Sequence, residues 1–373
     1  MARAWLKAAI AALALTGLSA SAHAADTIKL GVPGAHSGDL VSYGQPSLNA
    51  ARIVVEEINA KGGILGRQVE VIAQDDQCKP ELGTNAATKL LSEGVDVIMG
   101  SICSGATKAA LPIYTDAKKI SISPSATTPD LTESGDNPYF FRTIASDSEQ
   151  GRLAAGFVRD TLGAKKVALL HDKGDYGRGF TNYAREVLEK GGVEIVLSEG
   201  ITPGAVDYSA VIQKLRQSKA DAVIFGGYHP EASKLVQQMK KRRVRIPFVS
   251  DDGVKDEAFL KVAAKEAEGL VYATGPKDVS KLPANIHARE LHVKKYGVAP
   301  GAFYDNAYAA TVALLAAIEK AGGTDNVDAI MHALRTEYVD TPIGRIKFDD
   351  KGDAEGIGFS IYKVEGGDFV EQK

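Results

Sequence analysis

The sequence contains little cysteine, almost no tryptophan and no strong excess of charge of either sign. Its 373 residues include 2 Cys and 1 Trp, and the formal net charge is -3. This balance argues against a general nucleic-acid partner, because neutralising phosphates requires a concentrated basic surface. The one basic run, KKRRVR at 240–245, ends a predicted amphipathic helix, where cations complement the helix C-terminus.

Long apolar runs are also missing, so the sequence offers no comfortable transmembrane span. The apolar stretch at 8–18 is short, follows Arg3 and Lys7, and precedes small residues at 22–24 that suit a cleavage point. Cysteine is absent from this junction, which leaves no lipid attachment site there. We therefore predict a signal peptide at 1–24 and a soluble periplasmic protein, not inserted in the membrane, from Ala25 onward.

The two cysteines, Cys78 and Cys103, both lie in the exported part of the chain. An even pair in an oxidising compartment favours a disulfide. Two buried free thiols stay open as an alternative, since spacing alone does not bring the sulfur atoms together. Metal binding is a weaker interpretation, because neither cysteine has a His or a second Cys at ligand spacing.

Apolar periodicity alternates between strand and helix along most of the chain. The alternation with short loops predicts parallel βαβ units, and its restart near Gln150 predicts a second doubly wound lobe. Strands are predicted at 28–32, 68–73, 95–99, 120–123, 167–170, 194–197, 222–225, 248–250 and 270–273, and helices at 48–58, 83–93, 107–118, 152–161, 179–190, 208–217 and 231–240.

Hydroxyl side chains follow two predicted strands of the first lobe. Ser104, Gly105 and Thr107 follow one strand, and the run SATTP at 125–129 follows the next. Ligands of doubly wound sheets lie beyond the carboxyl ends of the strands, where helix N-termini attract anions. Helix capping explains each group taken singly, but two such groups on adjacent strands predict a shared anion pocket.

Aromatic and acidic residues follow the strands of the second lobe, in HDKGDY at 171–176, GGYHP at 226–230 and SDDGV at 250–254. They predict a partner surface for a ligand with a carboxylate at one end and an ammonium at the other. Two structural alternatives compete with this interpretation. Asp251 and Asp252 could cap the following helix, and Tyr176 could be a core aromatic with its hydroxyl in water.

Enzymatic interpretations have little support. The loop GVPGAHSG at 31–38 lacks the dinucleotide-binding spacing, and the sequence contains no nucleophile elbow, no P-loop and no HExxH motif. His171 is the best candidate base, but no activated nucleophile can be assigned beside it.

Nearly the whole predicted mature chain resembles the periplasmic leucine/isoleucine/valine-binding proteins, the type I solute receptors of branched-chain amino-acid ABC importers. The resemblance rests on the ordered motifs INAKGGILGRQVEV, DDQCKPELG, SICSGATKAALP, ISPSATTPDLT, HDKGDYGRG, GITPGAVDYSA, GGYHPEA, AEGL and FDDKGD.

The resemblance implies an α/β fold with two Rossmann-like lobes joined by a three-crossover hinge. Lobe 1, on the ligand carboxylate side, would comprise 25–145 and 275–351, and lobe 2, on the ammonium side, 146–274 and 352–373. Cys78 and Cys103 match the family's lobe 1 disulfide, which would hold the loop near Ser104.

The resemblance also implies a set of ligand-binding residues. Ser104 and Thr127 would bind the carboxylate, the loop containing Ser125 and Ala126 would supply backbone contacts, and Gly105 would keep the approach open. Asp252 stands where the family has a glutamate that pairs with the ammonium, and Tyr43 replaces a tryptophan over the apolar side chain. Three further residues match cleft aromatics or the pocket lining: Tyr176, Tyr228 and Phe303.

The implied mechanism is closure of the lobes around an amino acid, read by the membrane subunits of an ABC importer, without cofactor, metal or covalent step. A branched-chain or neutral aliphatic amino acid is the leading ligand, and the receptor would act as a monomer. Alternatives are an amide, a urea-like solute or an aromatic carboxylate in the same fold, a sensing subunit for a membrane receptor, and a hydrolase that uses His171.

Overall fold

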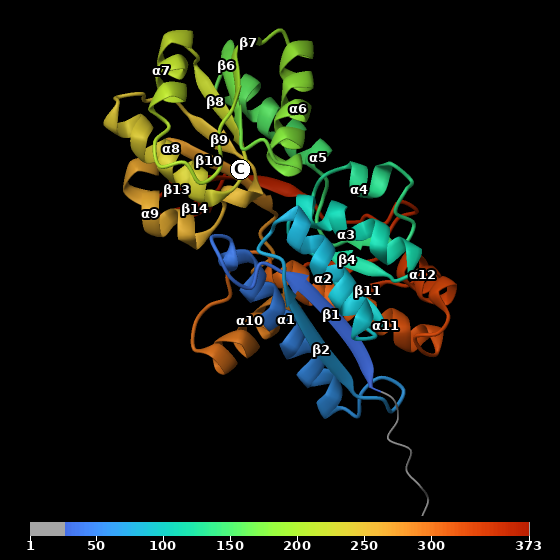
Figure 1. Ribbon diagram of the computed structural model, residues 1–373. Coiled ribbons are helices and arrows are strands. Elements are labelled where there is room, and N and C mark those ends of the chain that lie inside the picture. The colour runs from blue at the N-terminus through green and yellow to red at the C-terminus, as the bar shows by residue number, and fades with distance from the viewer. Residues whose placement is uncertain (1–26, 373) are drawn as a thin grey trace, which may run out of the picture.

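The computed structural model describes residues 27–372, which form two α/β lobes (Figure 1). The predicted signal peptide at 1–24 lies outside the described residues. Within 27–372, the helices are all too short or too polar to cross a membrane. The two-lobed fold with parallel sheets confirms the fold class predicted from the sequence.

Lobe 1 is built on a parallel five-stranded sheet in the order β2-β1-β3-β4-β5. Alternate residues of β3 face opposite layers: Val97 and Met99 pack with α1 and α11, and Ile98 packs with α2 and α3. The elements of this lobe are β1 (Ile28–Gly34), α1 (Val41–Ala60), β2 (Val69–Asp75), α2 (Pro80–Ser92), β3 (Val97–Met99), α3 (Ser104–Asp116), β4 (Ser121–Ser123), α4 (Asp130–Glu133), β5 (Phe140–Arg142), α10 (Pro283–Tyr296), α11 (Tyr304–Ala321), α12 (Val327–Thr336), β11 (Val339–Thr341) and β12 (Gly344–Ile346).

Lobe 2 is built on a seven-stranded sheet in the order β14-β13-β10-β9-β8-β6-β7. Strands β6 to β10 are parallel, and β13 and β14 add an antiparallel edge. Helices α5 and α6 cover one face, and α7, α8 and α9 cover the other. The elements are α5 (Asp147–Gly156), η1 (Phe157–Thr161), β6 (Lys166–His171), α6 (Asp175–Lys190), β7 (Glu194–Gly200), α7 (Ser209–Ser218), β8 (Ala222–Gly226), α8 (His229–Lys241), β9 (Phe248–Ser250), η2 (Asp252–Val254), α9 (Glu257–Ala267), β10 (Val271–Pro276), β13 (Phe359–Glu365) and β14 (Asp368–Glu371).

The chain crosses between the lobes three times: after β5, after β10 and between β12 and β13. The predicted boundary after residue 274 falls inside β10, which pairs with β13 as far as Pro276. Each lobe is therefore assembled from separate segments of the chain. The second and third connections lie side by side, since the Lys277 N–H donates to the Gly358 carbonyl at 3.1 Å.

Several helices begin earlier than the apolar pattern predicts, and in two of them, α1 and α6, a glycine of the first turn packs closely against another part of the chain. At Gly44 in α1, a Cβ atom would lie 2.0 Å from the carbonyl oxygen of Ala35. At Gly177 in α6, a Cβ atom would lie 2.3 Å from the carbonyl oxygen of Gly226. The missing side chains let the first turns of both helices pack directly against strand-end loops. These first turns carry Tyr43 and Tyr176 towards the space between the lobes.

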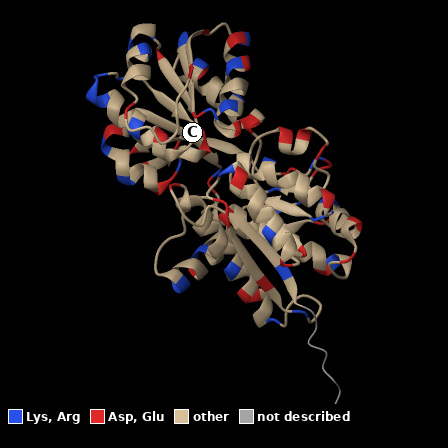
Figure 2. Cartoon of the chain, in the orientation of Figure 1, with Lys and Arg blue, Asp and Glu red and all other residues tan. Residues whose placement is uncertain are grey.

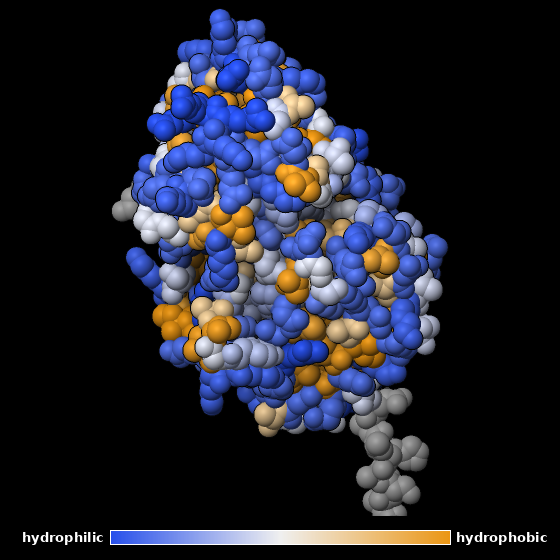
Figure 3. Space-filling view, turned by 60° about the vertical axis from the view of Figure 1, so that its left-hand side comes forward, coloured by the Kyte–Doolittle hydropathy of each residue, from blue (hydrophilic) through white to orange (hydrophobic). Residues whose placement is uncertain are grey.

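The surface carries residues of both charges and scattered hydrophobic residues. Basic and acidic residues are interspersed over both lobes (Figure 2), in keeping with the small net charge. On the face shown in Figure 3, hydrophobic residues form separate small patches within a mostly hydrophilic surface. The basic run at 240–245 straddles the end of α8, with Lys240 and Lys241 in the last turn of that helix, as predicted.

Candidate functional site

The predicted site residues converge where the strand ends of the two sheets face each other. A small cavity there has a volume of about 10 Å³, the scale of one water molecule. Ala126 and Thr127 are fully buried behind this lining. The cavity is lined by Tyr43, Ile102, Cys103, Ser104, Ser125, Tyr176, Tyr228, Asp252, Gly253 and Phe303.

The lobe 1 side of the cavity is the N-terminus of α3. Ser104 is the first residue of this helix and is 2 % exposed, and its Oγ accepts a hydrogen bond from the Thr128 N–H at 3.3 Å. The buried hydroxyls of Thr107 and Thr127 form no hydrogen bond of good geometry within the described chain. Free amides of a helix N-terminus together with unpaired hydroxyls suit an anionic group.

The loop at 125–128 is held from behind by Arg142, which sequence reasoning did not identify. The Arg142 side chain is fully buried, and its Nη1 donates to the carbonyl oxygens of Thr127 at 2.8 Å and Thr128 at 3.0 Å. Its Nε lies 2.5 Å from Asp353 Oδ1, which balances the charge. Arg142 therefore fixes the loop in place without lining the cavity.

Two hydroxyls of this loop region are committed to the backbone. Ser125 Oγ donates to the Ile102 carbonyl at 2.7 Å, and Ser123 Oγ donates to the Ser101 carbonyl and accepts from the Ala126 N–H at 3.0 Å. The Ser125 hydroxyl hydrogen is thus already used. Any contact of Ser125 with a ligand would come from its backbone, in line with the role expected from the resemblance.

The structure confirms the predicted disulfide between Cys78 and Cys103, whose Cα atoms lie 5.3 Å apart. Cys103 is the residue immediately before α3, and Cys78 lies in the loop between β2 and α2. The bridge therefore fixes the backbone next to Ser104.

Removing the disulfide should destabilise the protein. The bridge closes a 25-residue separation, for which loop-closure entropy gives a loss of about 3.5 kcal/mol in the free energy of unfolding. The double variant Cys78→Ala/Cys103→Ala measured by urea unfolding tests this value. Reduced wild-type protein is the matched control and should lose a similar amount. A loss below about 0.5 kcal/mol in both samples would contradict the expectation.

The lobe 2 side of the cavity centres on Asp252, which is 2 % exposed. The Tyr176 hydroxyl donates to Asp252 Oδ1, and Gln150 Nε2 donates to the same oxygen at 3.2 Å. Gln150 Oε1 in turn accepts the Asp252 N–H at 2.8 Å. The other oxygen, Asp252 Oδ2, is buried and has no partner among residues 27–372. This arrangement fixes the carboxylate and leaves one oxygen available to a donor.

Two further buried carboxyls lie close to Asp252. Asp147 shares the Gln150 amide with Asp252, at 3.1 Å, and its Oδ2 forms no hydrogen bond of good geometry in the described part of the chain, although the nearby Thr127 hydroxyl lowers the Asp147 pKa. Asp251 accepts the Gly227 N–H at 2.7 Å. Burial, and then the charge of Asp252, raises the pKa of both Asp147 and Asp251 well above the ordinary value.

Burial also raises the pKa of Asp252, to about 6, although hydrogen bonds from Tyr176 and Gln150 oppose the change. Carboxylates crowded in a buried site repel one another, and a cation placed between them relieves that repulsion. The cluster therefore suits an ammonium group. Asp147 and Gln150 were missed from the sequence, although their i, i+3 spacing at the start of α5 places both on one helix face.

Aromatic rings close the cavity from both lobes. The Tyr43 hydroxyl donates to the Gly253 carbonyl at 2.5 Å, and the ring centroids of Tyr43 and Phe303 are 5.5 Å apart. The Tyr228 ring packs in tilted contacts against Tyr176, at 5.2 Å between centroids, and Tyr43, at 6.0 Å. Tyr43 from lobe 1 thus touches lobe 2 directly, and an apolar group entering the cavity would meet aromatic faces.

The structural alternatives for these residues are decided by their contacts. Asp256, not Asp251 or Asp252, caps α9 by accepting the Ala258 N–H. The Tyr176 hydroxyl is buried and donates a hydrogen bond to Asp252 Oδ1, so it does not lie in water. His171 lies at the end of β6, does not line the cavity, and accepts the Lys173 N–H through Nδ1 at 3.0 Å.

Known proteins are similar to this chain in sequence and in architecture. The model of the periplasmic binding protein family matches residues 27–368. A leucine-, isoleucine-, valine-, threonine- and alanine-binding protein from Pseudomonas aeruginosa is 35% identical over 95% of this chain and 94% of its own.

Two solved structures are similar over 93% of this chain. A leucine-binding protein from Thermotoga maritima has a TM-score of 0.86 with 25% identity over 98% of its chain. A branched-chain amino-acid transporter substrate-binding protein from Streptococcus pneumoniae, in complex with isoleucine, has a TM-score of 0.81 with 29% identity over 100% of its chain. These findings confirm the resemblance predicted from the motifs.

Proposed function

The chain belongs to the periplasmic binding protein family, and we propose that it is an exported receptor that captures an amino acid between its lobes for an ABC importer. The observation that carries the proposal is that the N-terminus of α3 and a cluster of buried carboxyls lie at one cavity, on opposite lobes. The names of the relatives point to branched-chain or neutral aliphatic amino acids as the first ligands to test.

In this proposal the ligand carboxylate binds at the N-terminus of α3. The Ser104 hydroxyl can donate its hydrogen to the ligand, because in its hydrogen bond with the Thr128 N–H it is the acceptor. The neighbouring Thr127 hydroxyl adds a second donor, and the backbone of Ser125 and Ala126 completes the pocket. Charge-assisted bonds of this kind are short and strong, so they fix the orientation of the ligand.

The ammonium binds on lobe 2, where the unpaired oxygens of Asp252 and Asp147 accept its hydrogens. The apolar side chain then lies against Tyr43, Tyr228 and Phe303. No covalent step is involved, and His171 has no role in the site. Both charged ends are buried, so their desolvation limits the net gain in affinity.

Closure of the lobes supplies the mechanism. Interlobe contacts include Tyr43 to Gly253, Ser42 Oγ to His229 Nε2 at 3.2 Å, and Lys108 Nζ to Asp175 at 3.8 Å. A ligand larger than the 10 Å³ cavity enters only when these contacts part. Since its own contacts come from both lobes, it favours the closed form through its differential affinity. The importer would recognise that closed, monomeric form in the periplasm after signal-peptide cleavage.

A thermal-shift screen of mature protein, unfolded and refolded to remove carried ligand, tests the proposal. We expect leucine, isoleucine or valine to raise the melting temperature, because a ligand that binds only the folded state stabilises it by linkage. The corresponding amides and decarboxylated amines, which each lack one charged group, serve as matched controls and should have little effect.

Other outcomes of the screen separate the alternatives. Stabilisation by amides, urea-like solutes or aromatic carboxylates, without any amino acid, would keep the fold but overturn the proposed ligand class. A sensing role is tested in the cell instead. If deleting the gene leaves uptake of the stabilising amino acid unchanged, delivery to an importer is contradicted and sensing is favoured.

A further inference from the structure

A second and much larger cavity adjoins the site. Its volume is about 680 Å³, and it shares Asp252 and Phe303 with the small cavity. Residues from all three interlobe connections contribute to its lining, so it lies between the lobes and against the hinge. We call this space the hinge chamber. A volume of 300 to 1,000 Å³ is typical of small-ligand sites.

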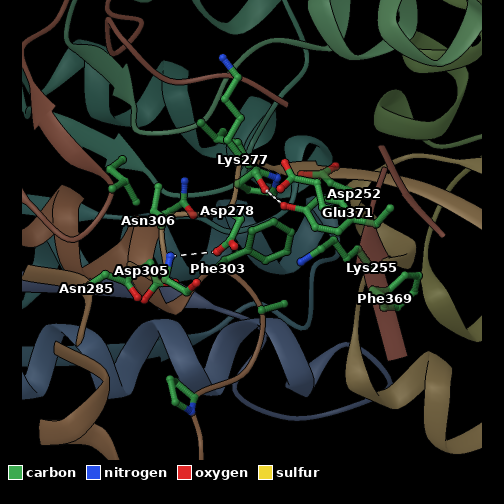
Figure 4. A pocket seen from close by; sticks show the side chains of 18 of the residues that line it. Asp252, Lys255, Lys277, Asp278, Asn285, Phe303, Asp305, Asn306, Phe369 and Glu371 are labelled. Atoms are coloured by element: carbon green, nitrogen blue, oxygen red, sulfur yellow. Dashed lines mark hydrogen bonds between the residues drawn. The ribbon is translucent and has the colours of Figure 1, made fainter. Parts of the chain in front are cut away.

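Phe303 stands between the two spaces. It precedes α11 in the left-handed backbone region, with φ 61°, which is uncommon for an aromatic residue. Its ring packs edge-on against Tyr43 on the side of the small cavity. Figure 4 shows the ring between residues of lobe 2, such as Asp252 and Lys255, and residues of lobe 1, such as Asp305. A ligand atom passing this ring would leave the small cavity and enter the hinge chamber.

Three residues that line the chamber carry acceptor oxygens with no protein partner in the described chain. They are Asp252 Oδ2, Asn285 Oδ1 and Asp305 Oδ1, and all three are buried. Asn285 is fully buried, and its amide nitrogen already donates to the Pro342 carbonyl at 3.2 Å. Its free oxygen is therefore held in place. Buried acceptors left unpaired are costly, so the wall favours a molecule that brings N–H donors.

The charge of the residues that line the chamber also favours a ligand with N–H donors. Seven lining residues of the chamber are acidic and three are basic. Two of the three cations are engaged locally: Arg289 lies 2.7 Å from Asp305 Oδ2, and Lys255 Nζ lies 4.2 Å above the Tyr362 ring. The acidic excess gives the chamber a negative potential, which attracts a cation or a strongly polar donor group.

We propose that the hinge chamber is a side-chain subsite that admits amino acids with a long side chain ending in N–H donors, such as an amine, guanidine or carboxamide. This inference rests on the proposed function, because the α-carboxylate and α-ammonium must occupy the small cavity when the lobes close. The side chain then passes Phe303, and its terminal N–H groups donate to Asp305 Oδ1 and Asn285 Oδ1. Ligand specificity therefore extends beyond small aliphatic amino acids.

Calorimetry with lysine and norleucine tests the inference, since these two amino acids differ only in the terminal amine. We expect the refolded mature protein to bind lysine at least tenfold more tightly than norleucine. One charge-assisted hydrogen bond to the terminal amine is sufficient for a tenfold difference in affinity. The ratio of the two affinities is the readout, because it cancels any general loss of binding.

Two variants should move this ratio in opposite directions. Asp305→Asn removes an acceptor and frees the Arg289 cation, so the preference for lysine should fall about tenfold. Arg289→Gln frees Asp305 Oδ2, so the preference should rise. Asp325→Asn, a matched charge change at an exposed position outside the chamber, should leave the ratio unchanged. A merely structural role for the Arg289–Asp305 pair would move both chamber variants in one direction.

The outcomes separate this inference from the proposed function. Leucine binding without any lysine preference, or a preference that both chamber variants leave unchanged, overturns the subsite and leaves the receptor function intact. Failure of every amino acid, including leucine and lysine, overturns the proposed function itself. A lysine preference that responds with opposite signs to the two variants supports both.

Discussion

Replacing Asp252 with asparagine is expected to weaken amino-acid binding about a hundredfold. The change removes the charge that the ligand ammonium meets, and losing one member of a buried charge pair costs about 2 to 5 kcal/mol. The asparagine side chain has nearly the same shape, so the bonds from Tyr176 and Gln150 to Oδ1 can persist. Calorimetry on refolded wild-type and variant protein measures the difference.

Two controls isolate the ammonium contact. The 2-hydroxy acid analogue of the best ligand lacks the ammonium, so Asp252→Asn should change its affinity far less. Glu194→Gln makes the same charge change at an exposed position on β7, away from the cavity, and should leave both affinities unaltered. An amino-acid affinity for Asp252→Asn within about threefold of wild type would contradict ammonium recognition by Asp252.

Lowering the pH from 7 to 5 is expected to weaken amino-acid binding about tenfold. Because the pKa of Asp252 is about 6 in the ligand-free protein, most molecules carry the carboxylate at pH 7 and the neutral acid at pH 5. A bound ammonium favours the carboxylate, so each pH unit below 6 costs up to a factor of ten for this one proton. The amino-acid α-ammonium and α-carboxylate keep their charges across this range.

The variant again provides the control, because Asp252→Asn should remove much of the pH dependence between 7 and 5. The raised pKa of Asp147 and Asp251 would leave a smaller dependence in the same direction. Binding that is equally strong at pH 5 and pH 7 in the wild-type protein would contradict the proposed electrostatics.

The same carboxyl has the opposite effect on the stability of the ligand-free protein. Its pKa is higher in the folded state, about 6, than its ordinary value of 3.8, so protonation favours folding. This contribution is fully present below pH 3.8 and is lost as the pH rises through 6. Ligand binding therefore favours the ionised form of Asp252, whereas folding of the ligand-free protein favours the neutral form. A bound cation stabilises the ionised form.

Urea unfolding of ligand-free wild-type protein and of Asp252→Asn isolates the contribution of Asp252 to the pH dependence of stability. The stability of Asp252→Asn relative to wild type should be about 1 kcal/mol more favourable at pH 7 than at pH 5. The comparison is necessary because lowered pKa values at His171, His229 and His292 act in the opposite sense over the same range. A relative stability that does not change with pH would show that Asp252 titrates normally.

Local pattern and motif order were sufficient for several features of this protein. The alternation of strand and helix predicted the parallel strands β1 to β4 and β6 to β10, since period-2 and period-3.6 patterns reflect which face each residue buries. It missed the three-residue strand β5 (Phe140–Arg142). The ordered motifs predicted the family and the pairing of Cys78 with Cys103. Hydroxyls after β3 and β4 and acids after β9 marked the two sides of the candidate site, because parallel strands bring their carboxyl ends to one edge of each sheet.

Tertiary structure decided which of these groups act together. No local pattern shows that Arg142 is fully buried behind the loop at 125–128. The contact of Gln150 with Asp252 is also hidden, because it links two segments far apart in the sequence. The hinge chamber is likewise absent from the sequence, since the three interlobe connections that line it come from separate parts of the chain. Sequence alone determined the family, the lobes and the chemistry at the strand ends. Burial, and with it the pKa of Asp252 and the space beside the site, depended on how the two lobes pack.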